Sequence, residues 1–153
     1  ALARIQKSLV SDECARGCSL FLVDVDNFKQ VNDGFGHPEG DRVLQEIARF
    51  LSRKMRKDDI VARIGGDEFA VFAAGLGPGD ALDRVLGQLS GDIYAEGGRP
   101  EDMPEDLRPS VTVGVAGTLR APVTFDALYQ TADEALYVAK RAGKSRGTLR
   151  VLE

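Results

Sequence analysis

The apolar run Cys18–Val25 constrains the fold most, because it is short, bounded, and interrupted by charge only where it ends. A run of this length and character is typical of a strand buried in the centre of a sheet. Asp24 and Asp26 fall at its end, where two anions are unfavourable unless something compensates them. Side chains alternate along a strand, so both aspartates point one way and Val25 points the other. The run therefore predicts a central strand whose end requires a partner for negative charge.

Helical and strand patterns interleave along the rest of the chain. Apolar residues recur at helical spacing near the start and again, most regularly, from Phe125 to Ala142. Glycine or proline marks the ends of several of these segments. The predicted helices cover residues 2–15, 28–34, 38–51, 80–94 and 125–142, and the predicted strands cover residues 18–25, 60–64, 69–73, 110–118 and, at an edge, 148–152.

The strands 60–64 and 69–73 are separated by a short segment that begins with Gly65-Gly66, so they predict an antiparallel hairpin. An antiparallel hairpin among interleaved helices and strands predicts an α/β (α+β) fold with one mixed central sheet flanked by helices. The connection from Glu96 to Pro109 holds three prolines and several acids. It predicts an exposed, poorly ordered loop.

The composition fits a single globular domain, with 153 residues, 43% hydrophobic and 29% charged. The formal net charge of −4 argues against a nucleic-acid polymer as partner. No apolar run approaches the roughly 20 residues of a membrane helix, so we expect no membrane contact within this segment and a cytoplasmic location. Cys14 and Cys18 predict reduced, partly buried thiols, because no second cysteine pair completes a zinc site. The chain opens inside a helix, and we expect it to be one domain of a longer multidomain protein.

Two further acids, Asp67 and Glu68, follow the paired glycines at the tip of the predicted hairpin. If the hairpin and the first strand are neighbours, these acids converge with Asp24. Clustered carboxylates repel one another, and a divalent cation is the usual remedy; oxygen ligands suit Mg²⁺ or Mn²⁺. The alternative is that the acids are turn and cap residues, with Asp26 as the N-cap of the next helix. An EF-hand is excluded, because Lys29 stands where that loop needs glycine.

Basic residues occur where a phosphate ligand would need them. Lys140 and Lys144 lie about one helical turn apart at the end of the last predicted helix. A metal held by few carboxylates commonly binds phosphate oxygens as well, and Gly65-Gly66 allows the backbone to approach a ligand closely. The alternative is that the basic cluster complements the helix dipole. No P-loop is present, because the glycine five positions before Gly143 is missing.

Four ordered segments resemble the signatures of GGDEF domains. Residues 24–33 (DVDNFKQVND) resemble D-x-D-x-F-K-x-x-N-D, and residues 36–41 (GHPEGD) resemble G-H-x-x-G-D. Residues 63–69 (RIGGDEF) resemble R-x-G-G-D-E-F, and residues 132–140 (ADEALYVAK) resemble A-D-x-A-L-Y-x-A-K. The resemblance implies a fold like the palm of polymerases and class III nucleotide cyclases. It also implies a diguanylate cyclase activity, in which two GTP molecules form cyclic di-GMP and two pyrophosphates.

The resemblance also implies roles for the acidic residues. Asp24 and Asp67 would hold Mg²⁺ or Mn²⁺ through carboxylates, and Val25 would do so through its carbonyl. Asp67 would also receive the proton of the 3′-hydroxyl, and Glu68 would assist a second metal. Each domain of the family binds one GTP, so catalysis would require a homodimer in which two sites face each other.

Further positions match the family's substrate-binding residues. Asn32 and Asp41 would read the guanine edge, which offers donors that a carboxylate can accept. Three lysines would meet the β- and γ-phosphates; the family often has arginine at position 144, and lysine keeps the charge without the fork geometry. The substrate-binding residues implied are Phe28, Lys29, Asn32, Asp41, Gly65, Gly66, Lys140 and Lys144.

Arg56 and Asp59 form an R-x-x-D pattern at the spacing before Gly65 seen in the family's product-inhibition site. Arg56 can bind phosphate or stack on guanine, and Asp59 can accept from a guanine edge. Read without the family, the same residues would be a solvated helix end with mixed charges. The D-x-L-T-x-L-x-N-R turn that usually opens the family is absent from this chain, so we expect it to be cut off or lost.

Three functions compete for this sequence. The first is a metal-dependent diguanylate cyclase under product inhibition. The second is a weak or silent domain that senses cyclic di-GMP at Arg56 and Asp59, or GTP at the other site. The third is a different nucleotidyl cyclase or polymerase-like enzyme, which Asn32, Asp41 and the complete 63–69 segment disfavour. Silent members usually lose a signature acid, and this chain keeps all of them, which favours the first.

Overall fold

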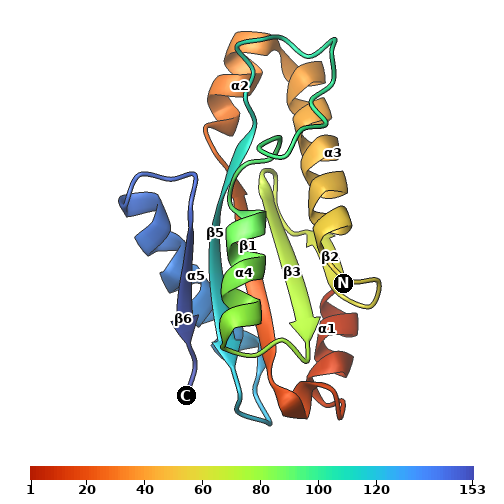
Figure 1. Cartoon of the computed structure of the whole chain (residues 1–153), viewed down its shortest axis with the longest axis vertical. Helices are drawn as coiled ribbons and strands as arrows, with labels where there is room; N and C mark the ends of the chain where they lie inside the picture. Colours follow the sequence, from red (N-terminus) through yellow and green to blue (C-terminus); the bar gives the residue numbers. More distant parts are fainter.

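The run Cys18–Val25 forms β1, the central strand of a mixed six-stranded sheet, in a computed structural model that describes all 153 residues (Figure 1). β1 pairs antiparallel with β3 on one side and with β5 on the other. β3 continues to β2, while β4 and the parallel strand β6 both pair with β5. The strands are β1 Cys18–Val25, β2 Ile60–Arg63, β3 Glu68–Ala74, β4 Gly91–Asp92, β5 Ser110–Thr118 and β6 Gly147–Val151. The predicted fold class is confirmed.

Helices cover both faces of the sheet, and the alternation of β1 decides which residues meet them. Phe21 and Val23 face α3 and α4, whereas Leu20 and Leu22 face α1 and α5. Asp24 has the same parity as Leu20 and Leu22, so it points to the α5 side. The helices are α1 Leu2–Leu9, α2 Phe28–Phe35, α3 His37–Lys54, α4 Asp80–Leu89 and α5 Phe125–Arg141, with a 3₁₀ turn at Cys14–Arg16. None of them combines the length and the apolar character needed to cross a bilayer.

Two predicted helices end earlier than their patterns indicate. The helix predicted over 2–15 ends at Leu9, and a separate 3₁₀ turn follows. The helix predicted over 80–94 ends at Leu89, because the chain enters the short strand β4 at Gly91, whose φ of 91° favours glycine. Cys14 and Cys18 are both free thiols and both buried.

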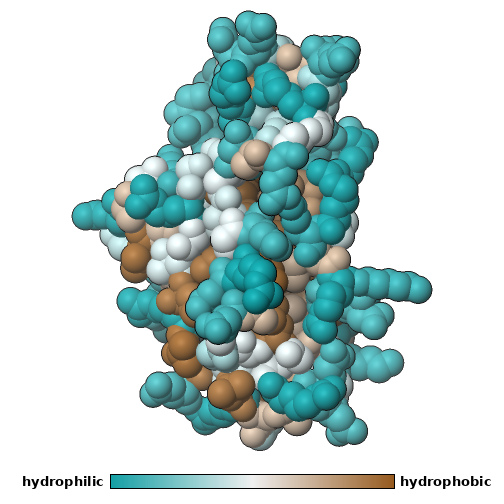
Figure 2. All heavy atoms as spheres, viewed as in Figure 1, coloured by the Kyte–Doolittle hydropathy of each residue, from teal (hydrophilic) through white to brown (hydrophobic).

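The segment from Glu96 to Pro109 is not the exposed, poorly ordered loop that its prolines predict. Met103 and Leu107 are 4% and 2% exposed and belong to the core under α3 and α4. The guanidinium of Arg99 donates to the carbonyls of Leu107 and Pro104, which closes the segment on itself. Figure 2 shows hydrophilic residues over the end of the molecule where α2 and this segment lie, in agreement with apolar anchors that are turned inward.

Ion pairs also fasten this segment to α3. Arg42 contacts Asp102 over 2.6 Å, and Lys54 contacts Glu96 over 2.6 Å. Because Asp102 and Glu96 are mostly exposed, each pair is worth little by itself. The buried Met103 and Leu107 therefore supply most of the anchoring.

Gly114 sets how closely α5 approaches the sheet. It lies in the middle of β5, and a Cβ there would stand 2.1 Å from the amide nitrogen of Leu136 and 2.5 Å from the carbonyl oxygen of Ala132. Both are backbone atoms of α5 and cannot rotate away. We expect Gly114→Ala to lower the free energy of unfolding by about 3 kcal/mol, because the helix must move off the strand. Urea denaturation measures this.

Gly87→Ala is the matched control. Gly87 is exposed inside α4 and has no neighbour within 4 Å of an added Cβ. The same substitution should there raise stability by about 0.5–1 kcal/mol, because alanine favours a helix. Equal effects at the two positions would contradict the backbone contact between α5 and β5.

Candidate functional site

The candidate site lies at the end of the sheet where β1 meets the tip of the β2–β3 hairpin. Asp24 stands directly opposite Glu68 in the antiparallel register. The next step of the register continues beyond the strand, because the amide of Val25 donates to the carbonyl of Asp67 over 3.0 Å. The prediction that the hairpin and the first strand are neighbours is confirmed.

A cavity of about 230 Å³ at this end collects seven of the predicted site residues. It is bounded by the end of β1, the start of α2, the hairpin tip and the end of α5. The predicted residues that line it are Asp24, Val25, Phe28, Lys29, Asp67, Lys140 and Lys144, and it adds Asp26, Asn27 and Gln30. Carboxylates and ammonium groups thus meet in one recess, as a ligand that carries both phosphate and metal would require.

Asp24 and Lys140 form an ion pair across the α5 side of the sheet. The side chain of Asp24 is 14% exposed, and burial raises its pKa although Lys140 acts in the opposite direction. Burial lowers the pKa of Lys140, but the hydrogen bond to Asp24 and the negative charges of Asp24, Glu68 and Asp67 together leave that pKa raised. The pair therefore favours the ionised form of Asp24 in a place where an unpaired carboxylate would be unfavourable.

Glu68 lies outside this cavity, on the side of the hairpin that faces α5. It lines a small recess with Tyr129 and Asp133. Burial raises the pKa of Glu68, and the negative charges of Asp24 and Asp67 raise it further. The three acids are therefore close enough to repel one another, although only two of them share the larger cavity.

The donor set fits a divalent cation. One oxygen of Asp24, Oδ1, is buried and has no hydrogen-bond partner, which leaves it free to bind a cation. No three acidic, histidine or cysteine side chains converge as a ready-made metal site. A cation here would therefore rely on two carboxylates together with backbone and ligand oxygens, as Mg²⁺ commonly does.

Asp26 is not the N-cap of α2. The cap residue is Asn27, and it makes no side-chain cap bond. The two carboxylate oxygens of Asp26 instead accept from the hydroxyls of Ser110 and Thr112 on β5. The interpretation as an N-cap therefore fails, because the neighbouring strand offers Asp26 two donors that lie far away in the sequence.

The two lysines at the end of α5 differ in their surroundings. Lys140 lies in the last turn of the helix, where a cation also complements the dipole. Lys144 lies beyond it, and its ammonium donates to Asn27 Oδ1 over 3.3 Å. Both Lys144 and Asn27 have left-handed backbones, with φ of 63° and 55°. This contact could not be predicted from the sequence, because the two residues lie 117 positions apart.

Arg63 holds the backbone of Gly65 and Gly66 in place. Its guanidinium donates to the carbonyl of Gly65 over 3.0 Å and to that of Gly66 over 2.7 Å. These bonds hold the tip that carries Asp67. Arg63 belongs to the 63–69 segment, but the sequence pattern assigned it no role of its own.

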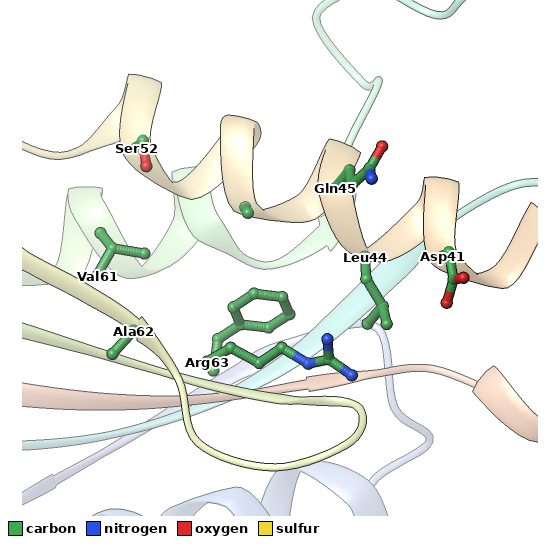
Figure 3. Close-up of a pocket in the computed structure, with 9 residues that line it drawn as sticks. Asp41, Leu44, Gln45, Ser52, Val61, Ala62 and Arg63 are labelled. Atoms are coloured by element: carbon green, nitrogen blue, oxygen red, sulfur yellow. The ribbon is translucent and has the colours of Figure 1, made fainter. Parts of the chain in front are cut away.

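Asn32 and Asp41 come from two consecutive helices that Gly40 brings together. A Cβ at Gly40 would stand 1.8 Å from Asn32 Oδ1, so only glycine leaves the amide its place. Asp41 lines a separate cavity of about 510 Å³ between α3 and β2, with Leu44 and Arg63 (Figure 3). Neither of the two predicted guanine-reading residues lines the cavity that holds Asp24, Asp67 and the three lysines, which we call the phosphate-side cavity.

Arg56 and Asp59 meet at the opposite end of the hairpin. The guanidinium contacts Asp59 over 3.1 Å and donates to the carbonyl of Ala74 over 2.6 Å. Asp59 also accepts from the backbone amide of Arg56 over 2.7 Å. β3 runs from Glu68 at the acidic site to Ala74 beside Arg56, so the pair of Arg56 and Asp59 lies roughly 20 Å from the acidic site.

Fold and site together define a domain with paired acids and clustered lysines at the end of a mixed sheet. Residues 3–146 match the family model for the diguanylate cyclase GGDEF domain, and the chain belongs to this family. It is 38% identical over 139 residues to the diguanylate cyclase TpbB of Pseudomonas aeruginosa, which covers 88% of this chain and 30% of TpbB. It is 37% identical over 131 residues to the response regulator PleD of Caulobacter vibrioides, which covers 83% of this chain and 28% of PleD.

Solved structures agree with this assignment. The GGDEF domain of TpbB from Pseudomonas aeruginosa aligns with a TM-score of 0.76 and 34% identity, covering 99% of this chain and 93% of that one. The GGDEF domain of DgcB from Caulobacter crescentus, in complex with cyclic di-GMP, aligns with a TM-score of 0.82 and 27% identity. That alignment covers 96% of this chain and 86% of the DgcB chain. The sequence resemblance is therefore confirmed.

The repulsion at Glu68 gives a stability prediction. A raised carboxyl pKa in the folded state means that ionisation opposes folding, so the penalty is present above the folded pKa and absent below the unfolded one. Glu68→Gln should therefore stabilise the protein in EDTA at about pH 7, by at most about 1 kcal/mol, and the gain should vanish near about pH 4. Thermal unfolding at the two pH values measures it.

Glu134→Gln is the matched control. Glu134 is half-exposed on α5 and contacts Arg150 over 2.8 Å, so its loss should be neutral or slightly destabilising. A Glu68→Gln protein that is less stable than the parent at about pH 7 would contradict the repulsion among the three acids.

Proposed function

We propose that this chain is the catalytic domain of a diguanylate cyclase, which condenses two GTP molecules into cyclic di-GMP with release of two pyrophosphates. The carrying observation is the cavity that joins Asp24 and Asp67 with three lysines. The family membership and the diguanylate cyclases among the relatives support the proposal. The chain corresponds to only 30% of TpbB, so the activity is proposed for this domain and not for a whole protein.

Different residues of the cavity bind different parts of the substrate. Lys29, Lys140 and Lys144 bind the β- and γ-phosphates, where three ammonium groups offset most of the negative charge. Phe28 lines the same cavity at the start of α2. The backbone at Gly66 lies open to the ligand, since no atom lies within 4 Å of an added Cβ there, whereas Gly65 lies against the side chain of Glu68. Asn32 and Asp41 then bind the guanine edge.

Each bond-forming step joins a 3′-oxygen to an α-phosphorus and breaks the bond from that phosphorus to the β-phosphate bridge oxygen. Asp67 accepts the proton of the 3′-hydroxyl, and pyrophosphate leaves towards the lysines. Asp24, Asp67 and the carbonyl of Val25 would hold Mg²⁺ or Mn²⁺, with Glu68 nearby, and the cation would stabilise the phosphate charge electrostatically. Because one chain binds one GTP, the attacking 3′-hydroxyl belongs to the GTP that is bound to a second copy of the chain. Lys29 and Lys144 are exposed, which leaves this side accessible to a facing copy.

A second, inhibitory site is proposed at Arg56 and Asp59, where cyclic di-GMP binds. Arg56 is 58% exposed and already oriented by its bonds to Asp59 and Ala74, so its remaining donors are available to phosphate. The complex of DgcB with cyclic di-GMP supports product binding by a domain of this fold. The alternative function is a silent sensor that binds cyclic di-GMP without turnover.

The test of the proposed activity is Asp67→Ala. Incubation with GTP and Mg²⁺, followed by chromatography, should show cyclic di-GMP for the parent and at least about a 100-fold lower rate for the variant, since a general base and a metal ligand are lost together. Asp83→Ala, an exposed carboxylate on α4, is the control and should keep the parental rate. Parental turnover in Asp67→Ala would show that the metal and base assignment is wrong.

The assay at increasing protein concentration separates the remaining possibilities. A specific activity that rises with concentration indicates the required dimer. Absence of turnover at every concentration, with cyclic di-GMP binding that Arg56→Ala abolishes, would favour the sensor instead.

The guanine contact is tested by Gly40→Ala. The new methyl group displaces the Asn32 amide, and we expect GTP affinity to fall about tenfold, the value of one lost hydrogen bond to a buried polar group. Gly34→Ala, on α2 with no atom within 4 Å of its added Cβ, should leave affinity unchanged. Titration with GTP in EDTA measures both, because turnover does not interfere there. Equal affinities for the two variants would remove Asn32 from the proposed contact.

A further inference from the structure

The turn between α5 and β6, residues 143–146, holds an unfavourable backbone conformation beside the phosphate-side cavity. α5 ends at Arg141, and Gly143 follows its C-cap Ala142 with φ 123°. The amide of Lys144 then donates to the carbonyl of Ala139 over 3.1 Å. Lys144 and Ser145 are then also left-handed, at 63° and 53°. Left-handed backbone is unfavourable for residues that carry a Cβ, so contacts from outside must maintain this turn.

A chain of hydrogen bonds from the sheet supplies such a contact. The amide of Ser145 donates to Thr112 Oγ1 over 2.8 Å. The same hydroxyl has one proton, and it donates that proton to the carboxylate of Asp26. The direction of the relay is thereby fixed, from the Ser145 amide through Thr112 to Asp26. Thr112 is fully buried on β5, so no water competes for its hydroxyl.

Further bonds keep both ends of the relay in place. Ser110 donates to the second oxygen of Asp26 over 2.7 Å, which orients that carboxylate. The amide of Val113 donates to the carbonyl of Arg146 over 2.9 Å, which ties the far side of the turn to β5. The turn therefore has one stable position relative to β1 and β5.

We propose that Thr112 and Asp26 are positioning residues, which hold the left-handed turn so that Lys144 presents its ammonium to the terminal phosphates of the nucleotide. Thr112 does not line the cavity and acts only through the turn. The identity of the ligand rests on the proposed function, whereas the relay rests on the hydrogen bonds alone. Asp26 thus serves the site by accepting hydrogen bonds and not by binding a cation.

The test compares Thr112→Val with Thr112→Ser. Valine keeps the branched shape that suits a strand but has no hydroxyl, and serine keeps the hydroxyl. The probes are 3′-deoxy-GTP, which cannot be cyclised, and GMP, which lacks the terminal phosphates, both titrated with Mg²⁺. We expect Thr112→Val to lower the affinity for 3′-deoxy-GTP about tenfold and the affinity for GMP by less than about twofold. Thr112→Ser should keep the parental affinities.

A double-substitution cycle ties the effect to Lys144. Lys144→Ala should lower the affinity for 3′-deoxy-GTP in the parent. In the Thr112→Val background it should cause almost no further loss of affinity, because the ammonium is already displaced there. Full additivity of the two changes would overturn the proposal. If Thr112→Val lowered the affinities for 3′-deoxy-GTP and GMP equally, the proposal would also be overturned, because that pattern indicates general damage to the site.

Hydrogen exchange of the Ser145 amide tests the relay without any nucleotide. The amide should be protected in the parent and in Thr112→Ser and should exchange faster in Thr112→Val; unchanged exchange in Thr112→Val would overturn the relay. If the parent fails to bind 3′-deoxy-GTP, the proposed function is wrong, and the exchange rates still decide whether the relay holds the turn. Should Thr112→Val not fold, Asp26→Ala removes the acceptor of both hydroxyls, leaves the Thr112 hydroxyl free to rotate, and should give the same faster exchange.

Discussion

The antiparallel pairing of β1 with β3 is the constraint on which the rest of the site depends. It places Asp24 opposite Glu68 and lets the amide of Val25 bond to the carbonyl of Asp67. A slip of one residue would send every side chain of β1 to the other face of the sheet, and Asp24 would then enter the core under α3 and α4. The same pairing that buries Leu20 and Leu22 therefore also decides that the acids converge.

Convergence of acids at the end of a buried strand opposes folding, and α5 offsets much of it. Lys140 contacts Asp24 from the last turn of that helix and opposes the rise in the Asp24 pKa that burial causes. Glu68 has no ion-pair partner, and burial together with the negative charges of Asp24 and Asp67 leaves its pKa raised. An end of the sheet that is left partly uncompensated in this way favours binding of a cation, because the cation removes a penalty that the fold retains.

Local patterns predicted β1, β5 and α5 closely, because each has a strong apolar period or a buried run with clear ends. They failed where long-range contacts decide the outcome. Met103 anchors the 96–109 segment through core contacts that its neighbouring prolines conceal. Asp26 could cap a helix or accept from an adjacent strand, and the choice depends on the register that brings Ser110 beside it. The acids and lysines of the site were predictable as a set, but their division between two cavities was not.

The positions of the Lys140 and Lys144 ammonium groups follow from one close contact between α5 and β5. Gly114 lets the backbone of α5 rest directly on β5, so the helix has little freedom to slide or tilt. Lys140 extends from the end of this helix, and Lys144 from the turn that follows it, which Thr112 holds to the same strand. β5 therefore fixes the helix at Gly114 and the turn at Thr112, and the spacing of the two ammonium groups is set by a strand that contributes no charged residue of its own.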